Sequence, residues 1–165
     1  MNTRIGFLSI GIVSLSSVCV ADNKAYLGVG LSNLELDGAN SVNFSITAGH
    51  DIRRWKFQSA KIHALDLAIE GQYADSLSGM DDVKHYSIFA ATRVYTSDRL
   101  YFKIKQGFTD FPDVTLTNAD AEHSHISAGI GLGYKIDSGS LELEYLYPNK
   151  TIHASLFEIS YKLHF

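Results

Sequence analysis

From about residue 25 to the end of the chain, apolar and polar side chains alternate with a period of two, and helical spacing never persists. Such alternation is typical of a β-strand with one apolar and one polar face. The only prolines, Pro112 and Pro148, both fall where loops are expected. The pattern therefore predicts an all-β fold.

Eight segments show this alternation, at about residues 25–36, 42–52, 62–74, 84–95, 100–108, 126–136, 141–147 and 157–165. In the first segment the apolar residues change parity at Leu34 and Leu36, which predicts a β-bulge near Asn33. Eight consecutive segments of this kind predict a single antiparallel up-and-down transmembrane β-barrel of about eight strands.

The connections between these segments alternate in kind. Residues 96–99 and 137–140 form tight turns, whereas 71–80 and 107–125 contain longer polar stretches. Short turns at one end and longer loops at the other are typical of outer-membrane barrels. Some connections fit this less well, because 53–60 is long for a turn and 37–40 and 148–150 are short for external loops.

The first 21 residues have the layout of a signal peptide. Arg4 supplies the positive charge, residues 6–18 are uncharged and mostly apolar, and Cys19 and Ala21 stand at positions −3 and −1 of a cut after Ala21. The apolar stretch is shorter than the roughly 20 residues that a retained anchor helix needs. A lipoprotein signal would need a small residue in place of Val18. We therefore expect residues 1–21 to be a signal peptide, and residues 22–165 to be one outer-membrane β-barrel domain of an exported Gram-negative protein.

Cleavage after Ala21 would leave 144 residues, one domain, with 13 basic and 18 acidic side chains and a net charge of about −5. No basic patch stands out, so we expect no nucleic-acid partner. The only cysteine leaves with the signal, so no disulfide is expected, and no cofactor motif is present. The mature chain holds no apolar stretch long enough for a membrane helix.

Alternation alone does not decide whether the apolar face meets lipid or a soluble core, since a lipocalin-like barrel shows the same period. The polar face holds five acids and five bases, which we expect to form a charge network in the lumen: Asp66, Glu70, Arg93, Lys103, Lys105, Lys135, Glu142, Glu144, Glu158 and Lys162. The same face carries small residues, which relieve crowding inside a narrow barrel: Gly28, Gly30, Gly49, Ala68, Ala91, Gly107, Gly129, Gly131 and Gly133. Together these features place the polar face inside and the apolar face toward lipid.

Aromatic residues on the apolar face gather toward the segment ends: Tyr73, Tyr86, Phe108, Tyr134, Tyr147 and Phe165. Aromatic girdles belong at the two interfaces of a membrane. Simple β-propensity is the alternative explanation, so the girdle supports the lipid-facing assignment without deciding it.

The last segment resembles the C-terminal assembly signal of bacterial outer-membrane barrels. The residues that carry this resemblance alternate and end on the terminal aromatic residue: Phe157, Ile159, Tyr161, Leu163 and Phe165. The resemblance implies recognition by the barrel-assembly machinery.

The chain also resembles the small outer-membrane protein β-barrel domain family, which is porin-like and related in form to OmpA-type barrels. Leu65–Tyr73 (LDLAIEGQY) resembles that family's third strand, Leu100–Phe108 (LYFKIKQGF) its fifth and Ile126–Tyr134 (ISAGIGLGY) its glycine-rich sixth. The resemblance implies a monomer in the outer membrane, in contact with its lipids and lipopolysaccharide. It implies little about activity, because members of the family do many things.

The best enzyme candidate is His125-x-Ser127 followed by Glu142, which loosely resembles the His/Ser/acid set of outer-membrane lipid A deacylases. The residues that flank the serine in that family are not matched here, and Gly139 stands near the place of the acid. Ser127 also lies on the face that we place inward. We therefore expect no catalytic site.

Histidines and basic residues gather at opposite predicted ends. The four histidines at the external end are His85, His123, His125 and His153. They could hold a transition metal, but solvated loop histidines are commoner and we predict no metal site. At the other end Arg53, Arg54, Lys56 and Lys61 surround Trp55. We expect a solvated rim there, with contact to anionic lipid headgroups as a further hypothesis.

The sequence thus predicts a non-enzymatic integral outer-membrane protein with a structural or surface-interaction role and a lumen plugged by ion pairs. The alternatives are a surface adhesin or recognition protein acting through residues 107–125, a narrow pore, and a lipid A-modifying enzyme.

Overall fold

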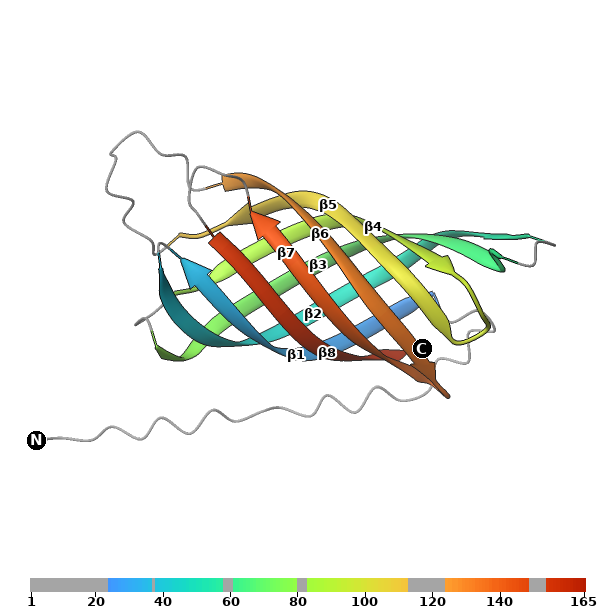
Figure 1. Ribbon diagram of the computed structural model, residues 1–165, viewed down its shortest axis with the longest axis horizontal. Coiled ribbons are helices and arrows are strands. Elements are labelled where there is room, and N and C mark those ends of the chain that lie inside the picture. Colours follow the sequence, from blue (N-terminus) through green and yellow to red (C-terminus); the bar gives the residue numbers. More distant parts are fainter. Residues whose placement is uncertain (1–23, 37, 58–60, 80–82, 113–123, 149–153) are drawn as a thin grey trace, which may run out of the picture.

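The computed structural model describes residues 24–36, 38–57, 61–79, 83–112, 124–148 and 154–165. Within these ranges the chain forms eight strands: β1 (Ala25–Leu36), β2 (Ala39–Lys56), β3 (Ala64–Gly79), β4 (His85–Tyr95), β5 (Leu100–Asp110), β6 (Ser124–Ile136), β7 (Gly139–Pro148) and β8 (Ala154–His164). Each strand pairs antiparallel with the next, and β8 pairs with β1, so the sheet closes into a barrel (Figure 1). The all-β, eight-stranded, up-and-down barrel predicted from the sequence is confirmed. The predicted signal peptide lies outside the described residues.

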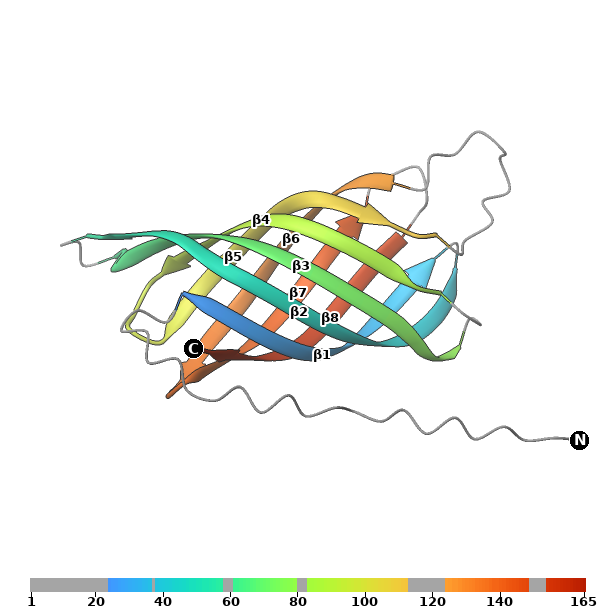
Figure 2. The same ribbon diagram turned by 180° about the vertical axis from the view of Figure 1, so that it is seen from behind.

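β1 begins and β8 ends at the same end of the barrel, which we call the terminal end. Phe165 N–H donates to the carbonyl of Ala25 at 2.9 Å there, and Ala25 N–H donates back at 3.3 Å. At the opposite end, the loop end, β1, β3, β5 and β7 end and β2, β4, β6 and β8 begin (Figures 1 and 2).

β2 and β3 are the longest strands, with 18 and 16 residues, and both extend past the rim at the terminal end (Figure 2). β1 follows β2 only as far as His50, so the last residues of β2 pair with β3 alone, after a register shift between Asp51 and Arg53. Two predicted connections change as a result. Most of 71–80 is strand rather than loop, because β2 begins at Ala39 and supplies hydrogen-bond partners as far as Gly79, and the first part of 53–60 belongs to β2.

The β-bulge predicted near Asn33 is absent from the described strand. β1 pairs in unbroken register with both neighbours, from Ala25 to Leu36 on β2 and from Tyr26 to Leu36 on β8. Leu34 and Leu36 therefore keep the inward parity of Tyr26 and are buried. Along the inner face of β1 the residues change from polar or small to apolar because apolar side chains fill the loop end of the lumen. The strand itself does not shift its register.

Short turns close three of the hairpins. Gly38 has φ +81°, a left-handed conformation that glycine adopts without steric cost, directly before β2 begins. Asp137 has φ +44° and connects β6 to β7, whose residues Ile136 and Gly139 pair directly. Two-residue hairpin turns favour such positive φ values because their twist matches that of the strands. In the turn 96–99, the Ser97 hydroxyl accepts a hydrogen bond from Leu100 N–H at 2.9 Å.

The outside of the barrel is an apolar band. Val29 is 52% exposed, Ile104 57% and Ile130 65%, and outward-facing aliphatic and aromatic residues of all eight strands join them. Every aromatic residue of the predicted girdle lies on this outer face, and Tyr73 and Tyr86 pack together at 5.2 Å between ring centroids. In the described part of the chain, no helix is long and apolar enough to cross a membrane. The predicted orientation, apolar face outward and charged face inward, is the one observed.

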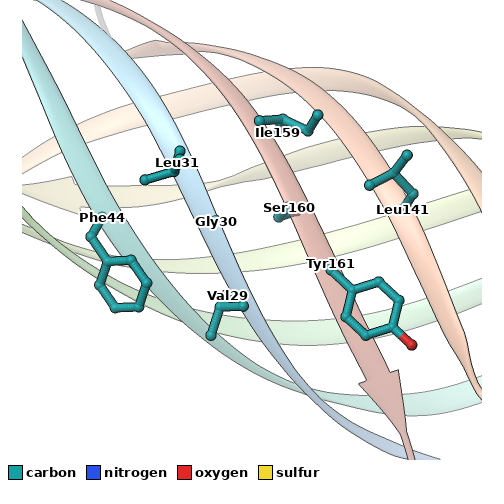
Figure 3. Close-up of a pocket in the computed structure, with 8 residues that line it drawn as sticks. All are labelled: Val29, Gly30, Leu31, Phe44, Leu141, Ile159, Ser160 and Tyr161. Atoms are coloured by element: carbon teal, nitrogen blue, oxygen red, sulfur yellow. The ribbon is translucent and has the colours of Figure 1, made fainter.

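A groove of about 390 Å³ lies on this outer face over the seam between β1 and β8 (Figure 3). Its sides are outward-facing side chains of β1, β2, β7 and β8, and its floor is the paired backbone of Gly30 and Ser160. Gly30 has no side chain and that of Ser160 is buried, so no side chain of this pair covers the outer surface of the barrel wall.

Candidate functional site

The lumen contains a cluster of buried charges at its centre. Lys103 on β5 lies 2.7 Å from the carboxylate of Glu70 on β3, 2.9 Å from Glu142 and 2.7 Å from Glu144, both on β7. All four side chains are at most 2% exposed. One ammonium group thus joins acids from two strands that are not neighbours in the sheet.

Two further lysines bind the same acids. Lys162 on β8 lies 2.7 Å from Glu142, 3.2 Å from Glu70 and 3.4 Å from Glu144. Lys105 forms an ion pair with Glu144. The cluster is therefore a connected network rather than a set of separate pairs.

Arg93 extends the network toward the terminal end. Its guanidinium lies 2.6 Å from Asp51 and 3.3 Å from Glu70, and 4.6 Å above the ring of Tyr26. Asp51 was not among the residues predicted from the sequence. Its position continues the inward parity of Gly49 on β2, and that parity could have identified it.

Glycines on the middle strand allow side chains to meet across it. Lys103 and Glu144 are both cross-strand partners of Gly131 on β6, and they reach each other over the place where a side chain would stand. The Tyr101 hydroxyl donates to Glu142 at 2.5 Å over Gly133 in the same way.

The same arrangement occurs on the opposite wall. Tyr26 on β1 and Glu70 on β3 are both partners of Gly49, and the Tyr26 hydroxyl donates to Glu70 at 2.6 Å. A Cβ atom on Gly49 would overlap the Tyr26 ring, and one on Gly133 would overlap the Tyr101 ring. Two of the inward glycines predicted to relieve crowding, Gly49 and Gly133, thus have a tyrosine side chain lying over them, whereas Gly107 faces the backbone of Ile88.

The other three predicted charges form no ion pair with the described members of this network. Asp66 pairs with Arg54 at 3.2 Å near the terminal rim, and Lys135 is half-buried with its ammonium 4.8 Å above the ring of Tyr95. Glu158, 1% exposed, accepts a hydrogen bond from Gln72 at 2.5 Å and forms no ion pair with any described lysine or arginine.

The charges of the network compensate one another. The four cations Arg93, Lys103, Lys105 and Lys162 are matched by four acids, Asp51, Glu70, Glu142 and Glu144. Desolvation of an ion costs several kcal/mol even after relaxation, and good pairing geometry with additional hydrogen bonds offsets it. Each member therefore depends on its partners, and the removal of one leaves an uncompensated buried charge.

An apolar cluster fills the lumen toward the loop end. It consists of buried side chains from β1, β4, β7, β8 and the segments next to the strands: Leu34, Leu36, Val83, Phe89, Phe111, Leu146, Ala154 and Leu156. From the terminal end to the loop end, the lumen therefore holds the ion-pair network and then this apolar cluster.

The candidate catalytic set is not brought together. Ser127 is fully buried on the inner face of β6, and its hydroxyl lies 3.5 Å from the backbone carbonyl of His125. Glu142 lies level with Gly133, about 20 Å along the strand from Ser127 at roughly 3.4 Å per residue. Glu142 is bound instead to Lys103 and Tyr101.

Two of the four histidines differ from the solvated loop residues that we expected. His85 and His125 lie in strands on the inward parity and are buried, and the His85 ring packs 5.5 Å from that of Phe111. His123 and His153 lie outside the described residues. Among the residues described, no group of three or more histidines, cysteines or carboxylates has the arrangement of a metal site.

The basic residues at the terminal end form an exposed rim on the extended part of β2. Arg53, Arg54 and Lys56 are exposed, Trp55 is half-buried, and the Arg53 guanidinium lies 4.9 Å above the Trp55 ring. The residues of the predicted assembly signal are all on the outer face at the last strand and its end, exposed by 41–53%.

Comparisons with known proteins place the fold. No family model matches the sequence, and no curated protein matches it either. Among solved structures, the outer membrane enzyme PagL aligns with a TM-score of 0.63 at 12% identity, covering 82% of this chain and 98% of PagL.

Two further structures are similar. The outer membrane protein Ail of Yersinia pestis aligns with a TM-score of 0.53 at 12% identity, over 87% of this chain and all of Ail. The N-terminal β-barrel domain of OprF from Pseudomonas aeruginosa aligns with a TM-score of 0.51 at 13% identity, over 85% of this chain and 97% of that domain. The chain therefore has the fold of small outer-membrane β-barrels.

Proposed function

We propose that this protein is an integral, monomeric protein of the bacterial outer membrane, with a structural or surface-interaction role and a lumen closed to solute flow. In this arrangement the terminal end faces the periplasm and the loop end faces outward.

The exposed apolar band supports the membrane assignment. Large apolar side chains cover the outer face of every strand, which would be costly in water and is required in lipid. A closed barrel also has no free sheet edge that would expose unpaired backbone groups to hydrocarbon. The likeness to known outer-membrane barrels agrees with this assignment in fold.

The observation that carries the closed-lumen proposal is the network around Lys103. A barrel of eight strands is just wide enough for side chains to fill its interior. Here acids and bases from opposite walls meet within hydrogen-bond distance at the centre, and the apolar cluster lies beyond them. A continuous water path would have to break both layers.

Burial of Ser127 favours an interaction role over catalysis. A lipid substrate would reach a nucleophile on the outer face, whereas this hydroxyl is buried inside the barrel and makes no hydrogen bond to an acid among the residues described. With the lumen filled, the loop end is the part of the molecule left to contact other molecules.

Membrane fractionation together with gel migration tests the assignment. We expect the full-length protein to sediment with the outer membrane, to resist extraction by carbonate, and to migrate differently before and after boiling. Recovery of the folded protein in the soluble periplasmic fraction would contradict the proposal.

A further inference from the structure

A polar recess lies in the lumen between the ion-pair network and the apolar cluster. Its centre is Gly30 on β1, whose cross-strand partners are Ser45 on β2 and Ser160 on β8. One step toward the loop end, Ser32 pairs with Asn43 and Glu158. The recess therefore brings side chains of three adjacent strands to one place, and Gln72 reaches it from β3 by its hydrogen bond to Glu158.

The space above Gly30 is small and bounded by oxygens. A Cβ atom on Gly30 would lie 2.6 Å from Ser45 Oγ and 2.9 Å from Glu158 Oε1, so both oxygens face the same space. Figure 3 shows the outside of this wall, where the backbone of Gly30 and Ser160 forms the floor of the outer groove.

Unpartnered polar atoms concentrate in this recess. Of the eleven buried side-chain nitrogens and oxygens in the described residues that have no hydrogen-bond partner, five belong to it: Ser32 Oγ, Asn43 Nδ2, Ser45 Oγ, Gln72 Oε1 and Ser160 Oγ. Every one of these side chains is at least nine-tenths buried. Buried polar groups without partners are rare in folded proteins, so such a group points to a missing water or ion.

The negative charge of Glu158 favours a bound cation over a water molecule in the recess. The network below is balanced, with its four cations engaged by Asp51, Glu70, Glu142 and Glu144. Glu158 is left with an amide hydrogen bond as its partner among the described residues. Lys105 acts on this carboxylate from beyond ion-pair distance, and a buried carboxylate that no cation contacts is unfavourable unless it is neutralised.

We propose that the recess binds one small monovalent cation, of the sodium or potassium class, between the Glu158 carboxylate and the surrounding neutral oxygens. Hard cations take oxygen ligands from carboxylates, amide carbonyls and hydroxyls, and Ser45, Ser160 and Gln72 supply the neutral ones. A single positive charge matches this one buried carboxylate, which no described lysine or arginine contacts. This site goes beyond the closed-lumen function and is independent of where the protein resides.

Refolding in defined salts tests the proposal. The apolar cluster covers the recess from the loop end, so the protein is refolded from urea into detergent with sodium, potassium or tetramethylammonium chloride at equal ionic strength. With the cation at about ten times its Kd, the unfolding equilibrium constant of the wild type falls about tenfold relative to tetramethylammonium. Equal stability in all three salts overturns the proposal.

Matched variants and a heavy probe locate the site. Glu158→Gln keeps the shape and the Gln72 contact but removes the charge, and we expect it to lose the salt-type difference. Ser45→Ala should weaken it, whereas Ser87→Ala, which removes a lumen hydroxyl bonded to Thr109, should leave it unchanged. Crystals grown in thallium(I) acetate should show an anomalous peak beside the Glu158 carboxylate. A protonated Glu158 with water alone in the recess would give no peak and would overturn the proposal.

Discussion

Lys103 and Glu144 lie 2.7 Å apart across Gly131, although they belong to strands that are not neighbours in the sheet. The ion pair exists because the middle strand has no side chain at that level. The same relation holds at Gly133 and Gly49, where side chains of the two flanking strands meet over a glycine.

Added volume at these glycines should be destabilising. Gly133→Ala places a methyl group into the Tyr101 ring, and we expect a loss of about 1–3 kcal/mol in the free energy of unfolding. Gly71→Ala is the matched control, because its Cβ would meet nothing within 4 Å. Urea unfolding in lipid vesicles measures both. Equal effects of the two changes would mean that the inner glycines have no packing role.

Removal of Glu70 should be more costly than removal of a surface acid. Glu70→Ala leaves Lys103, Lys162 and Arg93 short of one buried partner, and the expected loss is about 3–5 kcal/mol. Asp98, almost fully exposed and paired with His63, is the control, with an expected effect within about 0.5 kcal/mol for Asp98→Ala. If Glu70→Ala costs as little as Asp98→Ala, the network does not stabilise the barrel.

The loss in free energy of unfolding caused by an arginine on the outer face should depend on its depth in the membrane. Ile104→Arg, Leu132→Arg and Leu143→Arg should each cost about 2–4 kcal/mol in lipid vesicles, because these sites fall near the middle of the outward band. Ile136→Arg, next to the turn at Asp137, should cost about 0–1 kcal/mol. A negligible cost at the three central sites would refute the lipid-facing assignment.

Deletion of Phe165 should impair assembly while export continues. We expect the truncated chain to accumulate in the periplasm in a protease-sensitive form, since the terminal aromatic residue completes the predicted assembly signal. Phe165→Tyr, which keeps an aromatic end, is the control. Normal amounts of protease-resistant truncated protein in the outer membrane would show that this residue is not needed for recognition.

The strands and their faces could be predicted from the sequence because alternation is a local property of each strand. Local pattern also has limits. Leu34 and Leu36 looked like a register shift because the lumen changes from polar to apolar toward the loop end, which a single strand does not reveal. His85 and His125 lie at the beginnings of their strands, where alternation in the sequence does not separate a solvated loop residue from an inward-facing one.

Which charged side chains pair with each other in the lumen was harder to predict than which side chains face the lumen. The charges could be placed on one face, but which acid meets which base depends on the register of three successive strands, as at Tyr26, Gly49 and Glu70. Asp51 was missed because it follows the regular part of its segment, although it keeps the parity of Gly49. Asp66 and Lys135 were expected in the network but lie near the terminal rim.

Single-channel recording on the purified wild-type protein in planar bilayers tests the central claim most directly. A lumen filled by the network around Lys103 and by the apolar cluster should give no stable openings above the baseline of the bilayer. Reproducible openings of porin-like size from correctly folded, heat-modifiable protein would contradict the closed lumen and would identify the protein as a diffusion channel.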